Sequence, residues 1–419
     1  MNEHRLNAIQ VATLLVSASY GIGFLFGSGE MALSRGMGAS LYGLATALGM
    51  LLLAALATRL WRRGRAVWDL FGDAYGSRTQ EAVALLSLLW MAGVLAAQIQ
   101  GGAAVLRLLG MPSVWAFAVV LLAVFGVSRL TLGRASHVLG VFLALSAAVL
   151  VYALTDRQVA EIYLASPANF VTDLGRVESG SWFTILVAVT ALVCTGADYH
   201  QFLLAASNPR AAVVGCMLAA VCLALMSPMP ASVVIALQKS GYLDSLGDPK
   251  QAMPRALASS MHQWGPAAET ALLLALSAAA LGSAAAILRA MTGALAVAVR
   301  GRMLPGSKRC GLLVLLGGGW LAARGEGIIA TMVAVNVIYI ASVGIALCAL
   351  ILRHPLSPIQ ARSVMALGFA ASVTARVAAG MRWPGELADG IALAFGLGFS
   401  ALPLAYKAVQ ARPKASTGA

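Results

Sequence analysis

Charged residues are scarce in this sequence. Asp, Glu, Lys and Arg make up only 11% of its 419 residues, whereas hydrophobic residues make up 60%, and the mean hydropathy is +0.84. A soluble domain is typically about 25% charged. The composition therefore excludes a soluble globular protein and predicts a polytopic, all-α membrane protein surrounded by a lipid bilayer.

Acidic residues are the scarcer of the two charged classes. Sixteen Asp and Glu against 29 Lys and Arg give a net charge of +13, which taken alone would suggest a nucleic-acid partner. The basic residues, however, fall between apolar runs rather than along one amphipathic face. That distribution is typical of residues that set membrane topology, so nucleic acid is excluded as a partner.

Catalytic motifs are also missing. The sequence contains no HExxH, GxSxG or Walker loop, so neither an enzyme nor ATP-driven transport is expected from this chain. Its cysteines form no CxxC pair and lie in or beside apolar runs, where we interpret them as packing residues. They are Cys194, Cys216, Cys222, Cys310 and Cys348.

Long apolar runs dominate the chain instead. Crossing about 30 Å of hydrocarbon takes about 20 residues, and on that basis about twelve spans are predicted. Their limits are roughly 8–33, 37–60, 80–107, 112–130, 136–155, 181–206, 211–238, 267–299, 309–323, 327–352, 359–380 and 387–408. The first span is too long and too broken for a signal peptide, so we expect it to be retained.

Basic residues in the short loops set the expected orientation. With a cytoplasmic N-terminus, most loop Arg and Lys face the cytoplasm, and the two longest loops, near 156–180 and 239–266, face outward with balanced charge. The positive-inside rule therefore predicts an inner-membrane protein with both termini in the cytoplasm.

Two of the spans are interrupted near their middles. The first carries the sequence SASYGIGF at 17–24, and the sixth carries CTGADYHQ at 194–201. In hydrocarbon, every backbone N–H and C=O must be satisfied internally, so a break is tolerated only where it is buried or lines a cavity. Broken helices at corresponding places in two halves of a chain indicate the binding site of a transporter.

The spacing of the two breaks indicates an internal repeat. Each broken span is followed by four more, and with five spans per unit the second unit must enter the membrane from the opposite side. We therefore predict one transmembrane domain with a 5+5 inverted repeat, 8–155 and 181–352, and two additional C-terminal helices in 359–408.

Four stretches carry a resemblance to a known family. VSASYGIGF at 16–24 resembles the broken first helix of LeuT-type transporters, and WDLF with YGSR, within 68–78, is similar to the loop before the third core helix of sodium:solute symporters. QFLLAASNPR at 201–210 resembles the end of that family's sixth helix, and AAALGSAAAIL at 278–288 resembles the Ala-Ala-x-x-Ser-Thr signature of its eighth helix. The chain thus resembles the sodium:solute symporter family, which has the LeuT-type fold of the amino acid-polyamine-organocation superfamily.

This resemblance implies a sodium site between the first and eighth core helices. Its ligands would be the carbonyls of Ser17 and Tyr20, in a register fixed to within one residue, together with Ala279, Gly282 and the Ser283 hydroxyl. The family usually has two adjacent hydroxyl residues on the eighth helix, and here Gly282 replaces the first. Ser283 has an alternative role as a small residue that lets helices pack closely.

Substrate contacts are expected from both breaks and from the cavity wall. Gln98 and Gln100 lie two apart on one helix and point in different directions, and Gln98, nearer mid-span, is the candidate for the cavity. Asn336 and Tyr339 share a face of the tenth span. The complete set of candidate substrate residues is Gly21, Gly23, Phe24, Gln98, Thr195, Asp198, Tyr199 and Asn336.

Asp198 is a carboxylate at a break near mid-membrane, where charged residues are costly and usually mark a substrate or proton pathway. Three roles compete: a counter-ion for an amine substrate, a proton carrier, or a structural partner of His200 or Arg289. His200 could take part in proton coupling, although a hydrogen-bonded structural role is favoured.

The sequence therefore predicts a secondary active transporter that couples sodium entry to uptake of a small polar organic solute such as an amino acid, sugar or carboxylate. Asp198 favours a solute with an amine. The alternatives are a proton-coupled or uncoupled transporter, or a solute-sensing membrane protein without ion coupling. A monomer is expected, because a ten-helix core encloses its own site.

Overall fold

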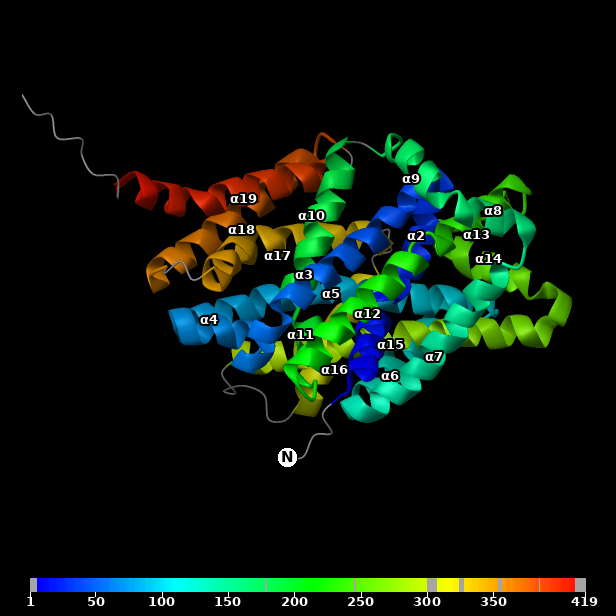
Figure 1. Ribbon diagram of the computed structural model, residues 1–419, viewed down its shortest axis with the longest axis horizontal. Helices are drawn as coiled ribbons and strands as arrows, with labels where there is room; N and C mark the ends of the chain where they lie inside the picture. Colours follow the sequence, from blue (N-terminus) through cyan, green and yellow to red (C-terminus); the bar gives the residue numbers. More distant parts are fainter. Residues whose placement is uncertain are drawn as a thin grey trace, which may run out of the picture.

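The computed structural model describes residues 6–177, 179–244, 246–299, 307–323, 328–352, 356–383 and 385–410, which are almost entirely helical (Figure 1). The α-helices are α1 (Ala8–Ser19), α2 (Ile22–Arg35), α3 (Leu41–Arg63), α4 (Val67–Tyr75), α5 (Ser77–Leu108), α6 (Ser113–Ser128), α7 (Leu132–Ala153), α8 (Arg157–Leu164), α9 (Ser166–Leu174), α10 (Ser179–Thr195), α11 (Ala197–Leu204), α12 (Pro209–Met226), α13 (Met229–Lys239), α14 (Ala252–Ser260), α15 (Pro266–Ala298), α16 (Ser307–Ala322), α17 (Ile328–Ile351), α18 (Pro358–Gly380) and α19 (Gly385–Gln410). Short 3-10 turns lie at Gly36–Ser40, Pro249–Gln251 and His262–Trp264.

The predicted spans correspond to these helices. Within the described part of the chain, eight helices are long and apolar enough to cross a membrane, and three shorter apolar helices accompany them. The protein is thus a multi-pass membrane protein. The two long loops of the prediction contain the short helices α8, α9 and α14. Val159 of α8 and Leu257 of α14 are buried.

Both predicted breaks are present. The first span divides into α1 and α2 at Tyr20 and Gly21, and the sixth divides into α10 and α11 at Gly196. Glycine favours such interruptions because it destabilises a helix interior by about 1 kcal/mol relative to alanine. The seventh span is also interrupted, between α12 and α13, where Pro228 lacks a backbone donor.

Corresponding helices of the two repeats pack against one another. The second spans of the repeats, α3 and α12, are in contact, and so are the third spans, α5 and α15. In addition, α1 packs on α12 and α10 packs on α3, whereas α16 and α17 pack on α5. This pairing is what a pseudo-two-fold relation between the halves requires.

The last two helices form a hairpin on one flank. In Figure 1, α18 and α19 lie beside α17, while α4 lies at the opposite end of the bundle from α8 and α14. We call the end that carries α8, α9 and α14 the loop-helix end. At the other end, Leu6 makes backbone hydrogen bonds of 2.8 Å with Ala205 and Ser207, which join the start of the chain to the end of α11.

Candidate functional site

The first break is pressed against α5 and α15. A Cβ atom built on Gly21 would lie 2.6 Å from Gln98 Oε1 and 2.6 Å from Ser283 Cβ. The backbone angles of Gly21, φ −64° and ψ −169°, are open to any residue. Glycine is therefore required here for close approach rather than for backbone freedom, and it brings the first, third and eighth spans together at one point.

Ser283 reaches the first span through its hydroxyl. Its Oγ donates a hydrogen bond of 2.6 Å to the carbonyl of Ala18, and the side chain is buried. The partner lies one residue from the predicted Ser17, a shift within the uncertainty of the predicted register. Ser17 and Tyr20 are also buried beside the break, and the Tyr20 N–H still bonds the Val16 carbonyl at 2.6 Å.

The other predicted ion ligands lie on the same helix. Gly282 is buried within α15 next to Ser283. The surroundings of Gly23 and of the Ala279 side chain lie outside what the structure describes. The Ala18 carbonyl and the Ser283 hydroxyl are neutral oxygens, the kind of donor that a hard monovalent cation prefers (compare). The described residues thus fit a sodium site, with Gly282 lowering the number of hydroxyl donors.

A small cavity lies between the two breaks. Its volume is ≈ 20 Å³, enough for about one water-sized occupant, since a buried water needs roughly 10–15 Å³. The lining residues are Ala18, Ser19, Tyr42, Trp90, Val94, Gln98, Leu192, Asp198, Tyr199, Ser283, Ile287 and Met332. The structure therefore brings four predicted residues, Gln98, Asp198, Tyr199 and Ser283, to one closed cavity.

Gln98 and Gln100 point in different directions, as their spacing predicts. Gln98 lines the cavity, whereas the Gln100 side chain donates a 2.9 Å hydrogen bond to the Ala322 carbonyl of α16. Phe24 packs instead between helices: a Cβ on Gly43 of α3 would lie 2.6 Å from its ring. Phe24 thus lies in the core, away from the lining of the cavity.

Asp198 lies at the start of α11, and only 2% of its surface is exposed. Backbone N–H groups of Asp198 and Tyr199 face its carboxylate, but its Oδ1 atom has no hydrogen-bond partner among the described residues. The predicted structural partners point elsewhere. His200 Nε2 bonds the Cys194 carbonyl at 2.9 Å, and Arg289 donates to the Leu130 carbonyl at 3.3 Å.

A second polar cluster lies where α10 ends. The Tyr339 hydroxyl donates to the Thr195 carbonyl at 3.3 Å, and its ring lies 5.7 Å from that of Trp90. One turn away, Asn336 is fully buried, and neither atom of its amide has a partner among the described residues. An unpaired buried amide costs about 1–3 kcal/mol for each group, so this residue is a candidate ligand contact.

The lining residues that the sequence interpretation missed include two aromatic ones, Trp90 and Tyr42. Trp90, Val94 and Gln98 are spaced four apart on α5 and line the cavity together. That spacing was readable from the position of Gln98. Tyr42 comes from α3, and nothing in its local sequence distinguishes it.

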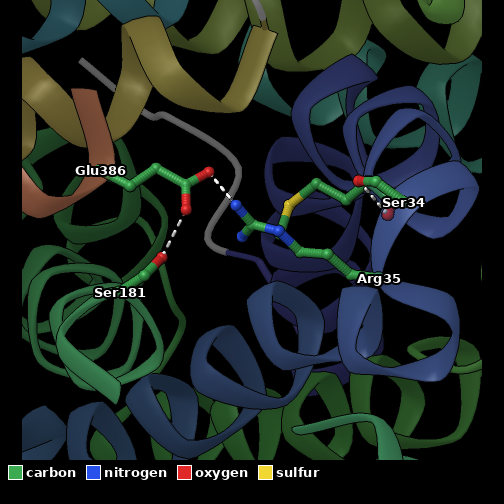
Figure 2. A network of polar contacts seen from close by, with 5 residues as sticks. Ser34, Arg35, Ser181 and Glu386 are labelled. Atoms are coloured by element: carbon green, nitrogen blue, oxygen red, sulfur yellow. Dashed lines mark hydrogen bonds and ion pairs between the residues drawn. The ribbon is translucent and has the colours of Figure 1, made fainter. Parts of the chain in front are cut away.

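A larger chamber lies toward the loop-helix end, with a volume of ≈ 190 Å³. Glu386 of α19 lies in its wall, forming an ion pair with Arg35 of α2 and accepting a 2.8 Å hydrogen bond from Ser181 of α10 (Figure 2). The lining residues include Glu30, Met31, Ser34, Thr184, Ile329 and Asp389. Glu386 of the C-terminal hairpin thereby joins α2 and α10, which are the halves of the two broken helices on this side.

Replacing Glu386 with glutamine should loosen these contacts and ease access to the chamber, because the amide cannot form the ion pair with Arg35. The measurement uses the Thr184→Cys variant, which places a thiol in the lining of the chamber. We expect maleimide to label this thiol several-fold faster when Glu386→Gln is added. Labelling of the same protein without Thr184→Cys is subtracted as background. Glu161→Gln is the control, since Glu161 pairs with Arg157 on the exposed surface of α8, where such pairs contribute little. Equal labelling with and without Glu386→Gln would show that these contacts do not restrict access to the chamber.

Three solved structures are similar to the whole chain. A Na+-coupled sialic acid symporter in a substrate-bound outward-open state has a TM-score of 0.71 at 14% identity, over 99% of this chain and 92% of the other. MhsT in complex with L-phenylalanine has a TM-score of 0.60 at 15% identity, over 97% and 99%. Mhp1, a nucleobase-cation-symport-1 family transporter in a closed conformation with bromovinylhydantoin bound, has a TM-score of 0.55 at 14% identity, over 97% and 94%.

Sequence comparison adds no assignment: no protein-family model matches the chain, nor does any curated protein. At these identities the structural likeness establishes the fold alone. The predicted architecture is confirmed by it, together with the two breaks and the paired repeats, and the sodium:solute symporter family stays a prediction. The chain has the LeuT-type transporter fold, with a 5+5 inverted repeat and a C-terminal helix hairpin.

Proposed function

We propose that this protein is a secondary active transporter that couples sodium entry to the uptake of a small polar organic solute by alternating access. The contact between Ser283 and the Ala18 carbonyl carries the proposal, because it joins a helix break to the facing helix with neutral oxygens from both. Sodium would bind at this contact and stabilise the packing of α1 against α15. Two of the three similar structures, the sialic acid symporter and Mhp1, are transporters by their descriptions, which supports transport rather than catalysis.

Alternating access is supported by closure at both ends. Leu6, Ala205 and Ser207 close one end by backbone hydrogen bonds, and Trp61 adds a 3.0 Å bond to the Ala206 carbonyl. Glu386 closes the other. A cavity closed on both sides is an occluded state, from which either end opens in turn. By the positive-inside rule, the loop-helix end faces outward, and both termini lie in the cytoplasm of an inner-membrane protein.

The sodium site can be tested by thermal unfolding of the detergent-purified full chain. We expect sodium chloride at 100 mM to raise the unfolding midpoint more than lithium, potassium or caesium chloride at the same ionic strength. At a hundredfold excess over its Kd, a ligand contributes about 2.7 kcal/mol, which for a chain of this size is a rise of about 3 °C.

Ser283→Ala should remove the sodium-selective part of this rise, because it deletes the hydroxyl that meets the Ala18 carbonyl. Ser277→Ala is a matched control on the same helix, since the Ser277 hydroxyl bonds the Leu273 carbonyl of α15 itself. Selectivity retained in Ser283→Ala would place the ion elsewhere. Absence of selectivity in the unaltered protein would reject sodium coupling and favour proton-coupled or uncoupled transport, or solute sensing.

A further inference from the structure

We propose that the transported solute carries an ammonium group, which the carboxylate of Asp198 binds in the central cavity. This inference rests on the proposed transport function, since it names the chemical class of the solute taken by the same site. The proposal follows from the charge of the cavity, from the rings that surround it and from the failure of neighbouring residues to pair with Asp198.

The cavity holds one acidic side chain. Among the described residues that line it, Asp198 is the only Asp, Glu, Lys, Arg or His. A buried charge is costly unless it is paired and hydrogen-bonded. No ion pair to Asp198 exists within the described part of the chain, and His200 and Arg289 are committed to backbone carbonyls. An ionised Asp198 in this cavity therefore needs a cation from outside the protein.

The same lining disfavours other solute classes. A carboxylate without an amine would meet Asp198 with a like charge, and no Lys or Arg among the described lining residues would offset it. A sugar brings no charge, so the sodium proposed at Ser283, in the same lining, would be the only counter-ion of the carboxylate. Poorly compensated charge is strongly unfavourable in a low-dielectric interior. A cationic group on the solute removes this cost when the site closes.

Aromatic rings favour an organic cation over a bare metal ion. Tyr42 of α3, Trp90 of α5 and Tyr199 of α11 line the cavity around Asp198. The faces of such rings attract ammonium groups, most strongly where water is excluded. The remaining walls, from Val94, Leu192, Ile287 and Met332, are apolar and suit a short carbon skeleton.

The solute must also be small. The cavity has a volume of ≈ 20 Å³, far below the roughly 300–1,000 Å³ of sites for drug-sized ligands. The cavity would therefore widen only modestly to hold the solute. Met332 lines the cavity, and Asn336 lies four residues further on the same face of α17. Widening along this face would bring the unpaired amide of Asn336 to a polar group of the solute.

The test uses small ammonium compounds paired with analogues of similar size that lack the ammonium group. Choline is paired with 3,3-dimethylbutan-1-ol, ethanolamine with ethylene glycol, and glycine with glycolate, each added in sodium chloride to the detergent-purified full chain. We expect at least one ammonium compound to raise the unfolding midpoint by about 3 °C at a hundredfold excess over its Kd, and its partner without nitrogen to leave the midpoint unchanged. A response to glycine alone would show that the solute also carries a carboxylate.

Asp198→Asn should abolish the response, because it keeps the side-chain size and removes the charge. Glu30→Gln is the control, since Glu30 lines the separate chamber at the loop-helix end, and it should keep the response. A sodium-selective rise in Asp198→Asn shows that the variant is folded and leaves the proposed transport function standing. The inference is overturned if no ammonium compound stabilises the protein, if the analogues without an ammonium group stabilise it equally, or if the response survives Asp198→Asn.

Discussion

Replacing Gly21 with alanine is expected to abolish both transport and sodium-selective stabilisation. The added methyl group would lie 2.6 Å from Gln98 Oε1 and 2.6 Å from Ser283 Cβ, well inside ordinary van der Waals contact. Relief of this overlap must move α2 away from α5 and α15, and so separate the Ser283 hydroxyl from the Ala18 carbonyl. A misplacement of about 1 Å at a functional site can cost about a hundredfold in rate, and we expect a loss of at least that size.

The expected loss has a steric cause, and replacing a glycine that has no close neighbours is the matched control. Gly126 lies within α6, and a Cβ atom there would meet nothing within 4 Å. Gly126→Ala should therefore leave solute uptake unchanged and stabilise the helix by up to about 1 kcal/mol. Both variants are compared by initial rates of solute uptake into proteoliposomes and by the sodium-dependent unfolding midpoint. Normal sodium selectivity in Gly21→Ala would show that the close approach of these helices does not form the ion site.

The breaks and spans could be predicted because local rules decide them. Hydrocarbon thickness fixes the length of a span, and a run such as Tyr20, Gly21 and Gly23 weakens a helix wherever it occurs. The same reasoning separated Gln98 from Gln100, because the direction of a side chain on a helix follows from its position in the sequence.

The exact residues of the ion site were harder to predict from the sequence. Ser283 meets the carbonyl of Ala18, and the resemblance alone placed the ligand at Ser17. Which carbonyl faces the eighth helix depends on how closely Gly21 approaches α15, and that is a contact between residues more than 250 positions apart. A sequence pattern cannot fix such a contact to one residue.

The side of each span that faces the protein interior was also hard to predict from the sequence. In a soluble helix, polar residues mark the exposed side, but lipid accepts apolar residues on every side. Leu89 is 38% exposed and the adjacent Trp90 is 1% exposed, although both are apolar. Trp90 was missed for this reason, and the contact of Glu386 with Arg35 was missed because it joins opposite ends of the chain.

Replacing Gly368 with alanine is expected to have the largest effect on stability. A Cβ atom at this position in α18 would lie 2.1 Å from the Ala341 carbonyl oxygen of α17 and 2.2 Å from Ser400 Oγ of α19. The Ser400 hydroxyl itself donates to that carbonyl at 2.6 Å. Small residues that let backbones approach closely are a common device of membrane helix packing. One methyl group here would push apart all three helices.

Because the overlap is with backbone, side-chain rotation cannot relieve it. Overpacking typically costs about 1–3 kcal/mol, and we expect Gly368→Ala to reach or exceed the upper value, with a fall in the unfolding midpoint of roughly 3 °C or more. Gly398→Ala is the matched control in α19, where a Cβ atom would meet nothing within 4 Å. Its midpoint should stay the same or rise slightly.

The two glycine variants together separate the ion site from the hairpin. Gly368 lies in the hairpin and contacts neither Ser283 nor Ala18, so Gly368→Ala should lower the unfolding midpoint while the sodium-selective rise persists. Gly21→Ala should lose the sodium-selective rise. If Gly368→Ala also lost its sodium response, α18 and α19 would be needed to hold the site itself, through Ala341 of α17 and the neighbouring Tyr339 that bonds the second break. If its midpoint did not fall, the close packing of α17, α18 and α19 would be contradicted.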